Sequence, residues 1–108
     1  MARHLLVVST NPAPGKEDEF NDWYSGTHVH EVVQILGFVS AQRFQVADAQ
    51  LGEPGQFRYL ALYELETDDV AATLQALRDA VPGMHMSESL DTTLSAVAFS
   101  PITERITA

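Results

Sequence analysis

The segment from Phe20 to Phe44, FNDWYSGTHVHEVVQILGFVSAQRF, holds most of the side chains that could do chemistry. Among its aromatic and ionisable members are Phe20, Trp23, Tyr24, His28, His30, Arg43 and Phe44. The segment joins a predicted helix to a predicted strand, so local geometry can bring these side chains to one pocket. We therefore take it as the candidate functional region.

His28 is the candidate acid and base of this region. It follows Gly26 and Thr27 and is expected in the first turn of a helix, where the positive helix end disfavours the imidazolium ion. A neutral imidazole can take a proton from carbon or from a hydroxyl group. The alternative is a histidine that only hydrogen-bonds the turn backbone. His30 lies two residues on and is expected to point away from His28, toward the surface.

Two further residues of the segment are candidates for catalysis. Tyr24 can donate a hydrogen bond to a substrate, or it can pack in the core. Arg43 alternates with apolar neighbours in a predicted strand, and a buried arginine is costly unless an anion accompanies it. Arg43 is therefore expected either to pair with an acidic side chain or to meet a substrate anion or enolate.

Aromatic residues are the candidates for substrate binding. Trp23 can form the wall of a pocket for a flat ring, or it can pack in the core or a dimer contact. Tyr63 shares a strand face with Tyr59, and either can project into the fold. His85 sits in a loop that can close over a pocket or lie loose on the surface. The predicted substrate-binding set is Trp23, Phe20, Tyr63, Phe44 and His85.

The composition excludes several classes of function. The 108 residues suit one domain, and the net charge of −9 disfavours nucleic acid and anionic membranes as partners. The chain has no cysteine, and its histidines show no ligand spacing, so we expect no metal site and no cofactor. The longest apolar runs fall far short of the roughly 20 residues that span a bilayer, which predicts a soluble cytoplasmic protein.

Hydrophobic periodicity and turn residues predict six elements in the order strand, helix, strand, strand, helix, strand. The strands are expected over 3–10, 38–47, 57–65 and 90–100, and the helices over 16–36 and 67–81. The first helix is expected in two pieces, because Gly26 is predicted to end one piece and Thr27 to cap the next. In the second strand, strict alternation places Phe38 with Phe44 and places Arg43 on the other face. Residues 102–108 are expected to be a loose tail.

This order predicts an α+β fold of the ferredoxin-like βαββαβ type, with a four-stranded antiparallel sheet and both helices on one face. The other sheet face would then be bare, although both alternating sets of strand residues contain large apolar side chains. A bare apolar face of this size is typical of an interface. The sequence therefore predicts a homodimer in which two sheets pack face to face.

The motif from Pro14 to Tyr24, followed by His28 and then by Gly37-Phe38 and Arg43-Phe44, resembles the EthD-like members of the dimeric α+β barrel superfamily. The FSPIT ending at residues 99–103 is similar to theirs as well. The resemblance implies a dimeric barrel with a pocket between the sheet and the helices. It also implies a choice of chemistry, since the superfamily includes muconolactone-type isomerases, polyketide cyclases and dehydratases, cofactor-free monooxygenases and heme-degrading enzymes.

Proton transfer is the chemistry that this residue set favours, because the sequence has no phosphate-binding glycine loop and no nucleophile elbow. The expected function is isomerisation, dehydration or cyclisation of a hydrophobic, ring-containing or polyketide-like carbonyl compound, without a cofactor. Three alternatives stay open. They are a cofactor-free monooxygenase of an aromatic substrate, a non-catalytic protein that binds a small apolar compound, and a heme-binding protein.

Overall fold

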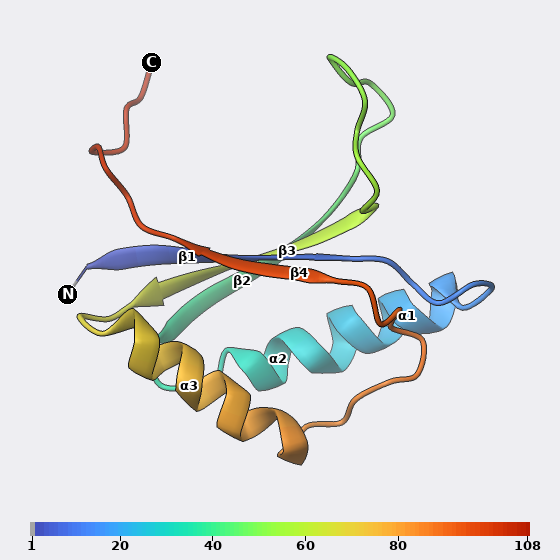
Figure 1. Cartoon of the computed structure of the whole chain (residues 1–108), viewed down its shortest axis with the longest axis horizontal. Coiled ribbons are helices and arrows are strands. Elements are labelled where there is room, and N and C mark those ends of the chain that lie inside the picture. The colour runs from blue at the N-terminus through green and yellow to red at the C-terminus, as the bar shows by residue number, and fades with distance from the viewer. Residues whose placement is uncertain (1) are drawn as a thin grey trace.

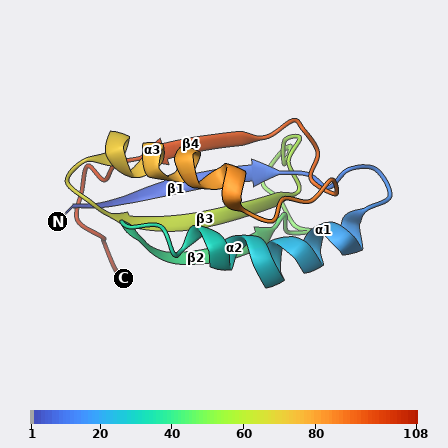
Figure 2. The same ribbon diagram turned by 90° about the horizontal axis from the view of Figure 1, so that it is seen from below.

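The structure is a computed structural model and describes residues 2–108. A four-stranded antiparallel sheet is built from β1 (Arg3–Thr10), β2 (Phe38–Gln45), β3 (Tyr59–Glu66) and β4 (Ser95–Phe99), in the order β2-β3-β1-β4. The helices α1 (Glu17–Trp23), α2 (Val29–Val32) and α3 (Val70–Ala80) all lie on one face of this sheet (Figures 1 and 2). The predicted ferredoxin-like βαββαβ fold is confirmed.

The first helical region is one continuous run and not two capped pieces. A π-helical turn, Tyr24–His28, connects α1 directly to α2, and the backbone stays helical through Gly26. The prediction that Gly26 ends a helix is therefore wrong. Glycine lowers helix propensity by only about 1 kcal/mol, and packing of the flanking apolar residues overrides that preference. Phe20, Tyr24 and Val32 are all buried along this run.

A β-bulge at the start of β2 corrects the predicted alternation of that strand. The pairing with β3 shifts between Phe38 and Ser40, so Val39 is an extra residue. A bulge moves the residues that follow it to the opposite faces of the sheet. Phe38 therefore shares the helix-facing side with Arg43, while Phe44 faces outward and is 43% exposed.

The core lies between the helices and the helix-facing side of the sheet. Its buried apolar members are Leu6, Phe20, Tyr24, Val32, Phe38, Tyr59, Ala61, Tyr63 and Leu65. The strand β3 alternates buried and half-buried residues along its whole length, as a central strand with one covered face does. The helical run from Glu17 to Val32 thus packs against the covered face of this strand.

The opposite face of the sheet is uncovered within the chain and has an apolar patch on β1 and β4. Leu5, Val97 and Phe99 are exposed there, with Val7 paired to Val97, and Phe44 is exposed on the same face at β2. The connection from 46 to 58 and the end of the chain both rise from the sheet on this side, away from the helices (Figure 1). Residues 100–108 form no helix or strand and are exposed.

Among residues 2–108, no helix has both the length and the apolar character that a membrane crossing requires.

Candidate functional site

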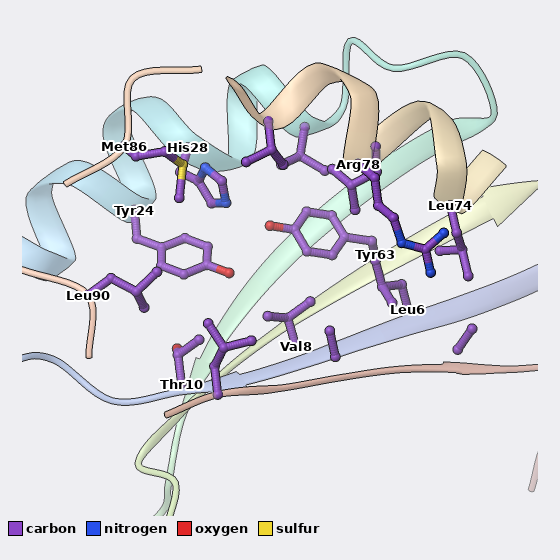
Figure 3. Close-up of a pocket in the computed structure, with 16 residues that line it drawn as sticks. Leu6, Val8, Thr10, Tyr24, His28, Tyr63, Leu74, Arg78, Met86 and Leu90 are labelled. Atoms are coloured by element: carbon purple, nitrogen blue, oxygen red, sulfur yellow. The ribbon is translucent and has the colours of Figure 1, made fainter. Parts of the chain in front are cut away.

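A cavity of about 350 Å³ lies between the helix-facing side of the sheet and the helices (Figure 3). Most of its 16 lining residues are leucine, valine, alanine or methionine. The polar members are Thr10, Tyr24, His28, Tyr63 and Arg78. A mainly apolar cavity with a few convergent polar groups is the usual form of a small-molecule site. This cavity is therefore the candidate functional site.

The π-helical turn places His28 at this cavity. In such a turn the backbone bonds span five residues and not four, and π-turns occur frequently at functional sites. His28 stacks on Trp23, with ring centroids 4.8 Å apart and planes 25° apart, and meets Tyr24 edge-on at 4.9 Å. The imidazole projects between the two layers toward the cavity (Figure 3). The aromatic neighbours thus hold the ring in one orientation.

His28 is held mostly as the neutral imidazole. Burial lowers the pKa of His28 below its ordinary value of 6.5, and the nearby Glu31 carboxylate opposes that shift only in part. The cause differs from the predicted one, because His28 lies inside a continuous helical run and not at a helix start. The Nδ1 atom is buried and has no hydrogen-bond partner. It is one of three such buried, unpartnered side-chain atoms in the described residues.

Tyr24 and Tyr63 supply hydroxyl groups to the same cavity. Their rings are almost fully buried, and their hydroxyls point toward one another across the cavity (Figure 3). Burial raises the pKa of both phenols, so each stays protonated at neutral pH. The Tyr24 hydroxyl contributes to the raised pKa of Tyr63, but no hydrogen bond of normal length and angle reaches the Tyr63 hydroxyl. A buried donor without a partner is costly, and a bound ligand with an acceptor would relieve that cost.

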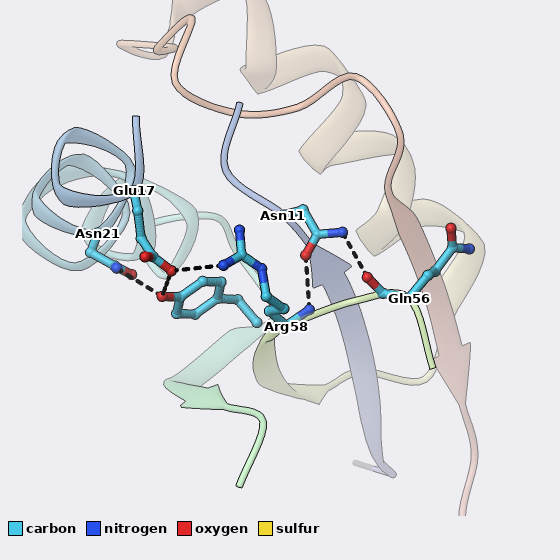
Figure 4. Close-up of polar contacts among 6 residues, drawn as sticks. Asn11, Glu17, Asn21, Gln56 and Arg58 are labelled. Carbon is cyan, nitrogen blue, oxygen red and sulfur yellow. Dashed lines mark hydrogen bonds and ion pairs between the residues drawn. The ribbon is translucent and has the colours of Figure 1, made fainter. Parts of the chain in front are cut away.

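Tyr59, on the same face of β3, has a different role (Figure 4). Its hydroxyl donates to Glu17 Oε2 at 2.5 Å and accepts a bond from Asn21 Nδ2 at 3.2 Å. Arg58 pairs with the same Glu17 oxygen at 3.2 Å, while its backbone N–H donates to Asn11 Oδ1. Tyr59 is therefore satisfied by a network that ties β3 to α1. Of the two strand tyrosines, only Tyr63 lines the cavity.

Arg43 has neither of its expected partners. Its guanidinium lies over the ring of Tyr24, 4.6 Å from the centroid, and its Nη1 donates to Ser25 Oγ at 2.8 Å. Its Nη2 is buried and unpartnered, and Arg43 does not line the cavity. No carboxylate in the described chain forms an ion pair with it. Burial lowers the pKa of Arg43, and the aromatic faces around it stabilise the cation in place of an acid.

The loop after α3 is fastened over the helical run by Trp23 and Glu31. The indole Nε1 of Trp23 donates to the carbonyl of His85, and the Glu31 carboxylate accepts from the His85 backbone N–H at 3.1 Å. The His85 ring is exposed and contacts Glu31 through Nδ1 at 2.9 Å. His85 itself stays outside the cavity, and its neighbour Met86 enters the lining. The loop closes over the pocket through its backbone contacts.

The structure brings together only part of the predicted site. His28, Tyr24 and Tyr63 line the cavity, and Trp23 supports His28 from behind. Phe20 is fully buried in the core beneath the site, and Phe44 lies on the other side of the sheet. Arg43 and His85 lie next to lining residues but not in the lining. Among residues 2–108, no three histidine, aspartate or glutamate side chains cluster as metal ligands.

Sequence reasoning missed Thr10, Arg78 and Met86. Thr10 ends β1 and is 2% exposed, and a threonine in an otherwise apolar strand was the available signal. Arg78 follows the apolar stripe of α3, which lines the cavity through Leu74 and Leu77. Met86 had no signal beyond the loop that holds it.

Comparison with known proteins places the fold. No family model and no curated protein matches this sequence. Solved structures do match, among them the heme-degrader MhuD from Mycobacterium tuberculosis with two hemes bound in its active site. It has 18% sequence identity and a TM-score of 0.66 over 94% of this chain and 98% of that chain. The chain has the fold of the dimeric α+β barrel superfamily.

Two further matches lie in the same superfamily. An ethyl tert-butyl ether D family protein from Bacillus halodurans matches over 94% of this chain and 100% of its own, with 18% identity and a TM-score of 0.57. A monooxygenase of Streptomyces coelicolor, in complex with nanaomycin D, matches over 99% of this chain and 93% of its own, with 15% identity and a TM-score of 0.51. The predicted likeness in fold to EthD-like proteins is confirmed.

The two strand tyrosines give a matched test of the site. Tyr63→Phe removes a buried hydroxyl without a partner and should leave the free energy of unfolding unchanged or raise it by about 1 kcal/mol. Tyr59→Phe removes the bonds to Glu17 and Asn21 and should lower it by about 1–2 kcal/mol. Urea unfolding of both variants measures the difference. A loss in Tyr63→Phe as large as that in Tyr59→Phe would show that the Tyr63 hydroxyl is structurally satisfied.

The protonation of His28 should couple stability to pH. Because burial lowers its pKa in the folded state, the unfolded chain binds the proton first as the pH falls below about 6.5. The His28 contribution to the free energy of unfolding is thus complete above that pH. It declines below that pH until the folded imidazole also protonates. Histidine NMR titration gives the midpoint, and urea unfolding with and without His28→Phe gives the coupling. A midpoint at or above 6.5 contradicts the assignment.

Proposed function

We propose that this protein binds a hydrophobic, ring-containing carbonyl compound in the cavity and catalyses proton transfer on it, with His28 as the acid and base. The observation that carries the proposal is the pairing of a neutral imidazole with an unpartnered tyrosine hydroxyl in an apolar cavity. Such a pair can remove a proton from carbon and stabilise the oxygen that becomes negative.

The reaction step follows from these two groups. A ring nitrogen of His28 takes a proton from the carbon next to the carbonyl, and the C–H electron pair becomes the double bond of an enolate. The Tyr63 hydroxyl, whose pKa is raised by burial, donates a hydrogen bond to the enolate oxygen. The imidazolium then returns its proton to another carbon or to a leaving hydroxyl. For ring closure, the enolate carbon attacks a second carbonyl carbon of the same molecule, the π pair of that C=O bond moves to its oxygen, and the imidazolium protonates the alkoxide. The outcome is isomerisation, dehydration or ring closure, with no external oxidant or reductant.

In this proposal Arg43 is a positioning residue. Its guanidinium lies over the Tyr24 ring and within 5.3 Å of the Phe20 centroid and 5.5 Å of the Tyr59 centroid. A cation over aromatic faces orients them and is worth about 0.5–2 kcal/mol. Arg43 thereby fixes the phenol of Tyr24, which in turn contacts His28 edge-on.

A cofactor-free monooxygenase is the second candidate. The Streptomyces coelicolor protein of the same fold is a monooxygenase, and a parallel Trp23–His28 stack can orient a phenolate for attack on O₂. The two reactions differ in oxygen demand, since proton transfer alone consumes none. A third candidate is a binding protein that holds the same compound without turnover, and it predicts a ligand recovered unchanged.

We also infer that the protein acts as a homodimer through the bare face of the sheet. Leu5, Val97 and Phe99 are exposed on adjacent strands there, and a second copy supplies a self-complementary apolar surface. The connection from 46 to 58 and the tail beyond 100 border this face on two sides (Figure 1). These two segments therefore border the face, and the exposed apolar side chains of β1 and β4 lie between them (Figure 1).

Proton exchange on a simple ring ketone tests the proposed chemistry. In D₂O the protein should accelerate exchange of the acidic C–H protons of 2-tetralone, followed by NMR. His28→Gln should reduce the acceleration by about 100-fold or more, because a general base contributes roughly 10²–10⁴-fold. Tyr63→Phe should reduce it without loss of stability.

The matched control is His30→Gln on the exposed side of the same helical run, which should leave exchange unchanged. Retained exchange in His28→Gln excludes His28 as the base. Product that forms only with O₂ present, at a rate that falls in its absence, favours the monooxygenase instead.

The assembly is tested by native mass spectrometry. We expect a mass near twice 11.9 kDa, with any co-purified ligand seen as an adduct. Val97→Asp should weaken the dimer by at least about 10-fold, because two-fold symmetry buries two unpaired carboxylates. Leu36→Asp, on an exposed apolar residue in the turn between α2 and β2, is the control and should leave the dimer intact. A monomeric wild-type protein contradicts the inference.

A further inference from the structure

Arg78 is the charged residue of the cavity lining. Among the lining residues in the part of the chain that the structure describes, it alone carries a permanent charge, and none is acidic. It extends from α3 toward Leu6 of β1, while His28 and Tyr24 lie toward the other end of the cavity (Figure 3). The cavity is thus mainly apolar, with His28 and Tyr24 at one end and the cation of Arg78 at the other (Figure 3).

The guanidinium of Arg78 is largely free to bind a ligand. Its Nη1 donates to Gln75 Oε1 at 3.2 Å, and Gln75 in turn donates to Asp79 Oδ1 at 2.9 Å. Within residues 2–108, Arg78 makes no ion pair with a carboxylate, whereas Arg3 and Arg58 both pair with glutamates. Gln75 therefore separates Arg78 from the nearest acid on its helix. The remaining N–H donors of Arg78 suit a planar bidentate anion such as a carboxylate.

Helix chemistry alone explains only part of this arrangement. Arg78 is in the last turn of α3, where a cation complements the negative helix end. Arg78 is exposed, so its side chain is a solvent-contacting part of the cavity lining. The helix-end role is satisfied by any side-chain direction. It does not account for the place of Arg78 in the lining of an apolar cavity, nor for the amide of Gln75 between Arg78 and Asp79.

We propose that the ligand of this cavity is an amphipathic organic anion, with its ring system in the apolar cavity and its carboxylate on Arg78. The proposal rests on the proposed small-molecule function of the same cavity. A carboxylate held at Arg78 would orient the ring with its far end toward His28 and Tyr63. Arg78 is thus a specificity-determining residue that selects ring-containing acids over neutral compounds of the same shape.

The test compares two probes of equal shape, naphthalene-2-carboxylate and the neutral naphthalene-2-carboxamide, by calorimetry and by NMR on the dimer as purified. The wild-type protein should bind the carboxylate about 5-fold more tightly, as expected for a charge pair with an exposed arginine at the edge of the cavity. That preference should shrink as salt rises, while carboxamide binding stays constant. The Arg78 Nε–H signal should shift with the carboxylate only.

Variants assign the preference to one residue. Arg78→Gln should bring the ratio of the two affinities to about one without changing carboxamide binding. The control Arg105→Gln removes the same charge from the exposed tail, outside the cavity, and should retain the full preference. Equal loss in both variants would mean that only net charge matters and would overturn the assignment to Arg78.

The remaining outcomes distinguish failure of the anion proposal from failure of the proposed small-molecule function of the cavity. Equal binding of both probes to the wild-type protein overturns the anion proposal and leaves the cavity as a site for neutral rings. Binding of neither probe overturns both.

Discussion

Phe20 packs against Tyr24 and Tyr59 with ring centroids 5.6 and 5.3 Å apart, and this contact joins the first helical run to the central strand β3. The site depends on that aromatic layer. Tyr24 continues it to His28, and Trp23 covers His28 from the other side. Arg43 completes the layer from β2, with its cation over three rings. Offset and edge-on contacts of this kind have preferred geometries, so they orient as well as bury the rings.

The cavity exists because α3 and the sheet do not fill the space between them. The residues of β4 that face α3 are Ala96 and Ala98, and β1 contributes Val8 beside them. On the other half of the sheet Tyr59 and Phe38 are buried in the core, and Tyr59 packs on Phe20 of the helical run. Small side chains under one helix and large ones under the other thus divide a single layer into a packed core and a binding site.

Two residues with buried, unpartnered polar atoms, His28 and Tyr63, line the cavity. Tyr59 resembles Tyr63 in strand, face and burial, yet Glu17 and Asn21 satisfy only Tyr59. A fold selected for stability alone would place phenylalanine at 63, because a buried hydroxyl without a partner is unfavourable. The same argument applies to the Nδ1 atom of His28. Both residues line a cavity that a ligand with its own polar groups can fill.

Periodicity in the sequence was sufficient for the order of elements and for the antiparallel sheet with helices on one side. These features depend on local patterns, since the side chains of a strand alternate and those of a helix recur every three to four residues. Residue type and the family resemblance, more than periodicity, singled out His28, Tyr24 and Tyr63, which line the cavity. The continuous helix through Gly26 and the bulge at Val39 were decided by tertiary packing. The first keeps Gly26 inside a helix, although glycine is typical of helix ends. The second inserts Val39 into β2, and this bulge alone moved Phe44 to the outer face. The roles of Arg43, Arg78 and His85 were likewise decided only in three dimensions. Their partners are aromatic faces, a cavity and a glutamate 54 residues away, which no local pattern encodes.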